Sequence, residues 1–181
     1  MDIIQAIDEK IFYFINVTLA NSVTDKFFPF ITVENHWFIF WTIMWLYLVI
    51  AGGRRGRAAA LLVLLLVLIS DQSSNVIKEL VHRIRPCSAL PNVHLLVGCT
   101  SSFSFPSSHA VNNFAGAYFF SYFYPRLKYA LYIGASLMAL SRVFCGVHYP
   151  FDILCGTIIG LIIGWIVITL WKALNKKLKI L

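Results

Sequence analysis

Five long apolar runs divide this chain, and they restrict it to a bundle of helices in a membrane. A helix needs about 20 mostly apolar residues to cross the hydrocarbon core of a bilayer. Only 13% of the 181 residues are charged, whereas a soluble domain of this size has about 25%. We therefore expect an all-α polytopic membrane protein, with a single domain over residues 1–181.

The expected spans follow the apolar runs. They cover residues 30–51, 57–80, 107–124, 127–144 and 150–172, with a long loop at 81–106. The second run changes character: Leu61 to Ile69 is aliphatic, but Ser70 to Asn75 is polar. Because polar side chains are costly in lipid, we expect that polar half to face the interior of the bundle.

The first 25 residues have a different pattern. Isoleucines such as Ile3, Ile4, Ile7 and Ile11 recur at helical spacing, with acidic and basic residues between them. This pattern predicts an amphipathic helix over residues 1–25 that lies at the membrane interface. The alternative is a sixth span, which would raise the number of transmembrane helices from five to six.

Basic residues at one set of connections predict the orientation. They are Arg54, Arg55, Arg57, Arg126, Lys128, Lys172, Lys176, Lys177 and Lys179. Five spans place all of them on one side, which the positive-inside rule makes cytoplasmic. In a bacterial inner membrane, the 81–106 loop would then face the periplasm. Topology and anionic lipid explain the net charge of +7 better than binding to nucleic acid does.

The cysteines give a weaker signal. Cys87 and Cys99 lie in the outward loop, twelve positions apart. An oxidising compartment would allow them to form a disulfide, and two free thiols fit the sequence equally well. No Cys/His spacing resembles a zinc site. The sequence leaves the oligomeric state open.

A first polar motif lies near the outward end of the second run. Lys78 and Arg85 are seven residues apart, which is close to two helical turns, so both could share a helix face. Pro86 would then end that helix or redirect the chain. The alternative is a pair of cations that snorkel to the interface.

A second motif, Pro106-Ser107-Ser108-His109, opens the third run. Proline and serine are typical of a helix start, where the first backbone N–H groups have no internal partner and attract anions such as phosphate. A histidine titrates near neutral pH and can donate a proton. The alternative is a capped helix with an interfacial histidine.

A third motif contains Ser141, Arg142, His148 and Asp152. His148 and Asp152 are four residues apart at the start of the fifth run, so one helical turn would stack them. A carboxylate bonded to one imidazole nitrogen fixes the tautomer and leaves the other nitrogen free to attack. The alternative is a buried ion pair.

Together the three motifs resemble the signature of the type 2 phosphatidic acid phosphatase (PAP2) family, to which the vanadium haloperoxidases also belong. The family pattern is Lys, six residues, Arg-Pro; then Pro-Ser-Gly-His; then Ser-Arg, five residues, His, three residues, Asp. Residues 78–152 match it except at Ser108, where the family has glycine. Serine fits poorly if that position needs a positive φ. It costs little in the first turn of a helix, which is the case that we expect.

The resemblance implies a bacterial integral-membrane lipid phosphatase. His148 would be the nucleophile that forms a phosphohistidine, Asp152 would orient it, and His109 would be the general acid. The expected phosphate ligands are Lys78, Arg85, Arg142, Ser107 and Ser108. Three fixed cations could serve where other phosphatases use magnesium, so no metal or other cofactor is expected.

The expected partners are the bilayer and a phospholipid or glycolipid substrate. Among envelope lipids we favour lipid A 1-phosphate, followed by undecaprenyl pyrophosphate and phosphatidylglycerophosphate. The alternative function is a lipid transporter or a non-catalytic lipid-binding protein on the same scaffold. Arg83 and His94 lie near the motifs but outside the family pattern, and we expect solvated loop residues rather than contacts to a headgroup.

Overall fold

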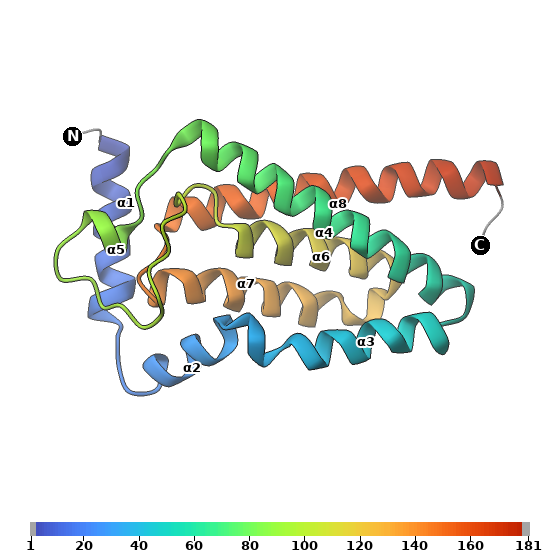
Figure 1. Cartoon of the computed structure of the whole chain (residues 1–181), viewed down its shortest axis with the longest axis horizontal. Helices are drawn as coiled ribbons and strands as arrows, with labels where there is room; N and C mark the ends of the chain where they lie inside the picture. Colours follow the sequence, from blue (N-terminus) through green and yellow to red (C-terminus); the bar gives the residue numbers. More distant parts are fainter. Residues whose placement is uncertain (1–2, 179–181) are drawn as a thin grey trace.

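The computed structural model describes residues 3–178, and within that range it is all-α, with no β-strand. The long helices run roughly side by side (Figure 1). They are α3 (Phe38–Ile50), α4 (Gly53–Val81), α6 (Ser108–Phe123), α7 (Lys128–Phe144) and α8 (Pro150–Leu178). The predicted fold class is therefore confirmed. Asp2 and Lys179, which belong to the N-terminal segment and the basic tail of the prediction, lie outside the described residues.

Helix α1 (Ile3–Tyr13) crosses one end of the bundle at a steep angle to the long helices (Figure 1). It buries Asp8 and Phe12, whereas Ile3 and Ile4 are 76% and 61% exposed. A helix that turns its carboxylate inward and its isoleucines outward suits an apolar surrounding. A π-helical turn (Phe14–Thr18) follows, and α2 begins at Thr24. The predicted 1–25 segment therefore contains more than one element. Its position at the membrane interface stays a prediction.

The predicted first span, residues 30–51, is wrong as a single helix. Helix α2 (Thr24–Thr32) ends where Val33 adopts an extended conformation, a 3-10 turn follows (Glu34–His36), and α3 begins at Phe38. Polar groups compensate the break: the Trp37 indole donates to the carbonyl of Ile31 at 3.0 Å. The 13 residues of α3 extend only about 20 Å, less than the roughly 30 Å of hydrocarbon in a bilayer.

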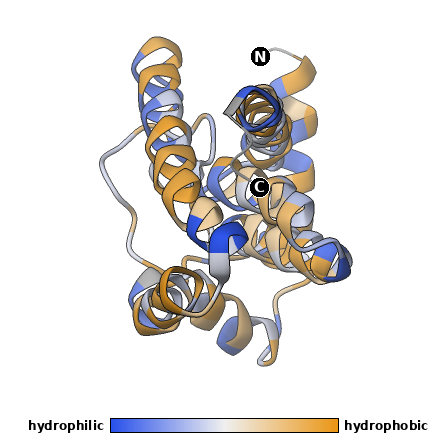
Figure 2. Ribbon diagram, turned by 90° about the vertical axis from the view of Figure 1, so that its right-hand side faces the viewer, coloured by the Kyte–Doolittle hydropathy of each residue, from blue (hydrophilic) through white to orange (hydrophobic). Residues whose placement is uncertain are grey.

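Two segments of the described chain are long and apolar enough to cross a membrane, Gly53–Ala89 and Pro150–Lys177. The other long helices are shorter, so the number of spans stays a prediction. Many large apolar side chains are nevertheless exposed, among them Phe38 and Leu61, each 70% exposed. Figure 2 shows hydrophobic residues along the outer helices and hydrophilic ones at the near end of the bundle.

The two groups of charged motifs lie at opposite ends of the bundle. The α3–α4 turn, the α6–α7 turn and the end of α8 share one end, and the α4–α6 connection and the α7–α8 turn share the other (Figure 1). The described basic residues of the predicted cytoplasmic side therefore lie away from the candidate site. Which end faces which compartment stays a prediction.

The prediction for the polar half of α4 is only partly right. Ser70, Ser74 and Lys78 are buried, and their spacing of four residues puts them on one helix face. Gln72 and Asn75 are exposed. Because consecutive helical residues point to all sides of the axis, a run of six polar residues cannot turn entirely inward.

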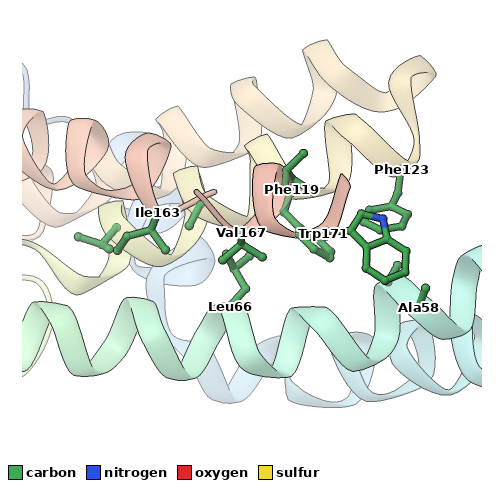
Figure 3. Close-up of a cluster of buried hydrophobic side chains, with 11 residues drawn as sticks. Ala58, Leu66, Phe119, Phe123, Ile163, Val167 and Trp171 are labelled. Carbon is green, nitrogen blue, oxygen red and sulfur yellow. The ribbon is translucent and has the colours of Figure 1, made fainter. Parts of the chain in front are cut away.

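Helix α6 packs against α8, α7 and α4. Its side chains join those of α4 and α8 in a core that includes Leu66, Phe119 and Val167 (Figure 3). Three glycines on α8, at positions 156, 160 and 164, face α6. A Cβ on Gly156 would lie only 2.9 Å from the carbonyl oxygen of Ser107. Glycine thus allows a close approach of the two backbones, which sets the start of α6 against the start of α8.

Candidate active site

Arg85 reaches the site from a connection and not from a helix. Helix α4 ends at Val81, and His82 takes the left-handed conformation with φ 53°. The prediction that Lys78 and Arg85 share one helix face is therefore wrong. Pro86 does not end α4 either, because it begins the short helix α5 (Pro86–Ala89).

The loop after α5 and the α7–α8 turn provide hydrogen-bond acceptors for the Arg85 guanidinium. Its Nε donates to the carbonyl of Ser102 at 2.7 Å, and its Nη2 donates to the Ser102 hydroxyl at 2.9 Å. Its Nη1 donates to the carbonyl of Val147 at 3.0 Å. Arg85 is consequently buried and fixed in orientation, as a rigid anion ligand should be.

The five-residue gap between Arg142 and His148 has a structural reason. The backbone N–H groups of Val147 and His148 both donate to the carbonyl of Arg142, at 3.1 and 3.3 Å. This fold-back requires Gly146, whose φ is +80° and whose missing Cβ would lie 2.7 Å from Val93. The turn therefore brings the arginine and the histidine to the same place.

His148 lies in this turn, two residues before α8 begins, and only 2% of it is exposed. Its Nδ1 is 3.3 Å from Asp152 Oδ2, and its Nε2 is 3.0 Å from Arg85 Nη1. Because arginine can only donate, Nε2 must accept, and the ring proton belongs on Nδ1. The structure thus brings the predicted pair together and adds Arg85 at the other nitrogen.

Burial also sets the charge of this histidine. Removal from water lowers the pKa of His148 to about 4, although the hydrogen bond and the charge of Asp152 oppose the shift. The imidazole is therefore neutral near pH 7, with a lone pair on Nε2.

Asp152 has partners that the motifs did not indicate. Its Oδ2 accepts from the Ser104 hydroxyl at 2.5 Å and from the backbone N–H of Tyr149 at 2.9 Å. Its Oδ1 accepts from Arg83 Nη1 at 2.6 Å. The prediction that Arg83 is a solvated loop residue is wrong, because its side chain is only 18% exposed and pairs with a buried carboxylate.

His109 is the second residue of α6 and faces another part of the site. With Thr32 and Arg142 it lines a cavity of about 240 Å³. The backbone of Thr32 hydrogen-bonds the imidazole, and the Thr32 hydroxyl accepts from Arg142 Nη1 at 2.8 Å. His109 also lies within electrostatic reach of His148 and Lys78. Sequence reasoning missed Thr32, which carries no motif signal.

The start of α6 supplies donors for an anion. Ser107 is the N-cap residue and Ser108 the first helical residue, so the expected first-turn position of Ser108 is confirmed. The Ser108 hydroxyl accepts from Lys78 Nζ at 2.6 Å. The Ser107 hydroxyl does not cap the helix, and it is buried without a hydrogen-bond partner within the described residues. A phosphate oxygen would satisfy it.

Three further residues of the α4–α6 connection take definite partners. Cys87 and Cys99 form a disulfide with their Cα atoms 6.2 Å apart, which decides between the two alternatives of the sequence. His94 Nε2 lies 3.1 Å from Asp25 Oδ2 of α2. His94 was expected to be a solvated loop residue, but it instead connects the loop to the N-terminal part of the chain.

A family model described as the PAP2 superfamily matches residues 58–176, which include all three motifs. The chain belongs to the PAP2 superfamily. It is 38% identical over 117 residues to "Phosphatidylglycerophosphatase B" of Bacillus subtilis, covering 59% of this chain and 53% of that protein. It is 30% identical over 118 residues to "Lipid A 4'-phosphatase" of Bacteroides thetaiotaomicron, covering 61% and 52%. The chain thus spans about half the length of these curated relatives.

The PAP2 assignment extends to the whole fold. A crystal structure of a "transmembrane PAP2 type phosphatidylglycerolphosphate phosphatase" from Bacillus subtilis superimposes with a TM-score of 0.76 at 27% identity. The likeness covers 98% of this chain and 89% of that one. These membrane relatives favour a bacterial membrane protein, as the apolar runs predicted.

Proposed function

We propose that this PAP2 protein hydrolyses a phosphate ester carried by a membrane lipid, through a phosphohistidine on His148. One observation carries the proposal. The His148 ring is buried between Asp152 on Nδ1 and Arg85 on Nε2. A carboxylate that holds the proton and a cation that can receive a phosphate oxygen are what an attacking imidazole needs.

In the proposed first step, Nε2 of His148 attacks phosphorus and the bond to the lipid oxygen breaks. His109 gives that oxygen its proton, so the lipid leaves as a neutral alcohol or, from a pyrophosphate, as the lipid monophosphate. In the second step, water attacks the phosphorus of the phosphohistidine and loses its proton to His109. The bond between phosphorus and Nε2 breaks, and inorganic phosphate leaves. Phosphoryl transfer is mostly positioning and charge stabilisation. In this proposal the cations Lys78, Arg85 and Arg142 supply the stabilisation.

The same proposal requires no metal. The three cationic side chains, the Ser107 hydroxyl and the N–H groups at the start of α6 would hold the three phosphate oxygens. Activity should therefore survive dialysis against EDTA. A loss of activity that added Mg²⁺ restores would contradict this part of the proposal.

The substrate class we propose is an envelope lipid in a bacterial inner membrane, with a multi-pass chain whose site faces the periplasm. Lipid A 1-phosphate was favoured from the sequence. The names of two of the relatives described above put phosphatidylglycerophosphate beside it, with undecaprenyl pyrophosphate next. A panel of these three lipids and phosphatidic acid, with phosphate release as the measurement, ranks them by kcat/KM.

The decisive experiment measures phosphate release by the detergent-purified protein and by His148→Ala. We expect release by the wild type and a loss of about 10⁶-fold in the variant, the size of effect seen when a nucleophile is removed. Activity of the variant within tenfold of wild type would exclude His148 as the nucleophile. Saturable lipid movement in vesicles without phosphate release would instead support the transporter alternative.

A further inference from the structure

A chain of buried charges connects α1 to the catalytic pair. Arg83 Nη2 donates to Asp8 Oδ2 at 2.7 Å and to Gln5 Oε1 at 2.8 Å, and both acceptors belong to α1. Arg83 Nη1 donates to Asp152 Oδ1 at 2.6 Å. One guanidinium thus bridges two carboxylates whose side chains are fully buried.

The remaining contacts close this chain into a ring. Asp8 Oδ1 accepts from the backbone N–H of Phe151, the residue directly before Asp152, at 2.9 Å. The Arg83 guanidinium also lies over the Tyr149 ring, 3.9 Å from its centroid. Arg83 is therefore fixed by a planar fork and an aromatic face, an arrangement that lysine cannot reproduce.

We infer that Arg83 is a positioning residue for the nucleophile and that Asp8 of α1 acts through it. Arg83 does not line the cavity that holds His109 and Arg142. It bonds Oδ1 of Asp152, whereas His148 contacts Oδ2. By holding Oδ1, it leaves Oδ2 directed at His148, Ser104 and the Tyr149 N–H. Asp8 in turn accepts from the other terminal nitrogen of the same guanidinium and so holds it in place.

Electrostatics favours the same assignment. Without Arg83, the carboxylates of Asp8 and Asp152 would be two buried charges near each other with no cation between them. A buried charge that loses its partner is strongly destabilised. Asp152 would then take up a proton or turn away, and in either case His148 would lose the acceptor that fixes its tautomer.

The inference rests on the proposed function, and its test uses the full-length protein in detergent with phosphatidylglycerophosphate as the probe. For Arg83→Gln we expect kcat to fall by about 10- to 100-fold, as for other residues that orient a site residue. KM should stay within about threefold, because Arg83 is not one of the proposed phosphate ligands. Arg83→Lys keeps the charge but not the fork and should recover part of kcat.

The second arm tests the link to α1. Asp8→Asn should lower kcat by about three- to tenfold, and in the Arg83→Gln background it should have almost no further effect, because the two residues act in series. Arg126→Gln, an exposed arginine on the α6–α7 turn, is the matched control and should equal the wild type. Melting temperatures in detergent check that each variant is folded.

The outcomes separate the two ideas. If the wild type releases no phosphate from phosphatidylglycerophosphate or from any other lipid of the panel above, the proposed function fails and this inference fails with it. If it is active only on another lipid of the panel, that lipid becomes the probe. If the wild type is active and Arg83→Gln keeps kcat within threefold, only the inference fails. A loss that lies wholly in KM, or additive effects of the Asp8 and Arg83 changes, also overturns it. If Arg83→Gln does not fold, the kcat values of Arg83→Lys and Asp8→Asn decide the question, and kcat at the wild-type level in both overturns the inference.

Discussion

The two histidines of the site are held by different kinds of partner. His148 sits in a turn between Asp152 and Arg85, and its carboxylate partner is itself bonded to Ser104 and Arg83. His109 sits in the first turn of a helix, bonds to the backbone of Thr32 and lines an open cavity. The contacts of His148 keep the lone pair on Nε2. The place of His109 at the cavity puts its imidazole where a leaving group could lie. This difference supports separate roles as nucleophile and acid.

A change of leaving group tests the separate roles of the two histidines most directly. An acid matters less when the departing oxygen is already a good leaving group, whereas a nucleophile is needed for every substrate. On a lipid phosphate, His109→Ala should lose about 10²- to 10⁴-fold, the usual contribution of acid catalysis. On p-nitrophenyl phosphate, it should lose less than about tenfold, and His148→Ala should remain inactive. Phosphate and nitrophenolate release measure both, and equal losses on both substrates would contradict the separate roles.

The pH profile tests the environment of His148 alone. Burial lowers the pKa of His148 to about 4, and protonation below that value would remove the attacking lone pair. The acid limb of kcat/KM, which reports the free enzyme, should therefore fall as pH decreases through about 4. An ordinary histidine would place that limb near 6.5. The measurement must be corrected for the substrate phosphate, which itself ionises near pH 6, and a corrected limb between 6 and 7 would show that His148 is not desolvated.

A smaller effect is expected on the His109 side. Thr32→Val removes the hydroxyl that accepts from Arg142 and keeps the carbonyl that bonds His109. Phosphate affinity should fall, with KM about three- to tenfold higher and kcat nearly unchanged, since one neutral acceptor contributes about 1 kcal/mol. Thr32→Ser keeps the hydroxyl and is the matched control. A fall in kcat without a change in KM would show that the Thr32 hydroxyl supports the proposed acid, His109, rather than phosphate binding.

Local patterns were enough for most of the helices and for the motif residues. Apolar runs predicted α4, α6, α7 and α8 within a few residues at most boundaries, because such runs follow from the need to bury or solvate apolar surface along a helix. The break between α2 and α3 escaped prediction. It falls at the polar residues Glu34, Asn35 and His36, which a search for apolar runs passes over. The hydrogen bond from the Trp37 indole to the Ile31 carbonyl spans the break.

The chemical groups of the site could be predicted from the sequence, because they occur in short motifs with regular spacing: Lys78, Arg85, His109, Arg142, His148 and Asp152. The residues that hold them in place are brought there by the fold. Arg83 and Asp152 are 69 residues apart in the chain, Ser104 and Asp152 are 48 apart, and Thr32 and Arg142 are 110 apart. Hydrogen bonds depend on distance and direction in space, so partners this far apart in sequence leave no pattern along the chain.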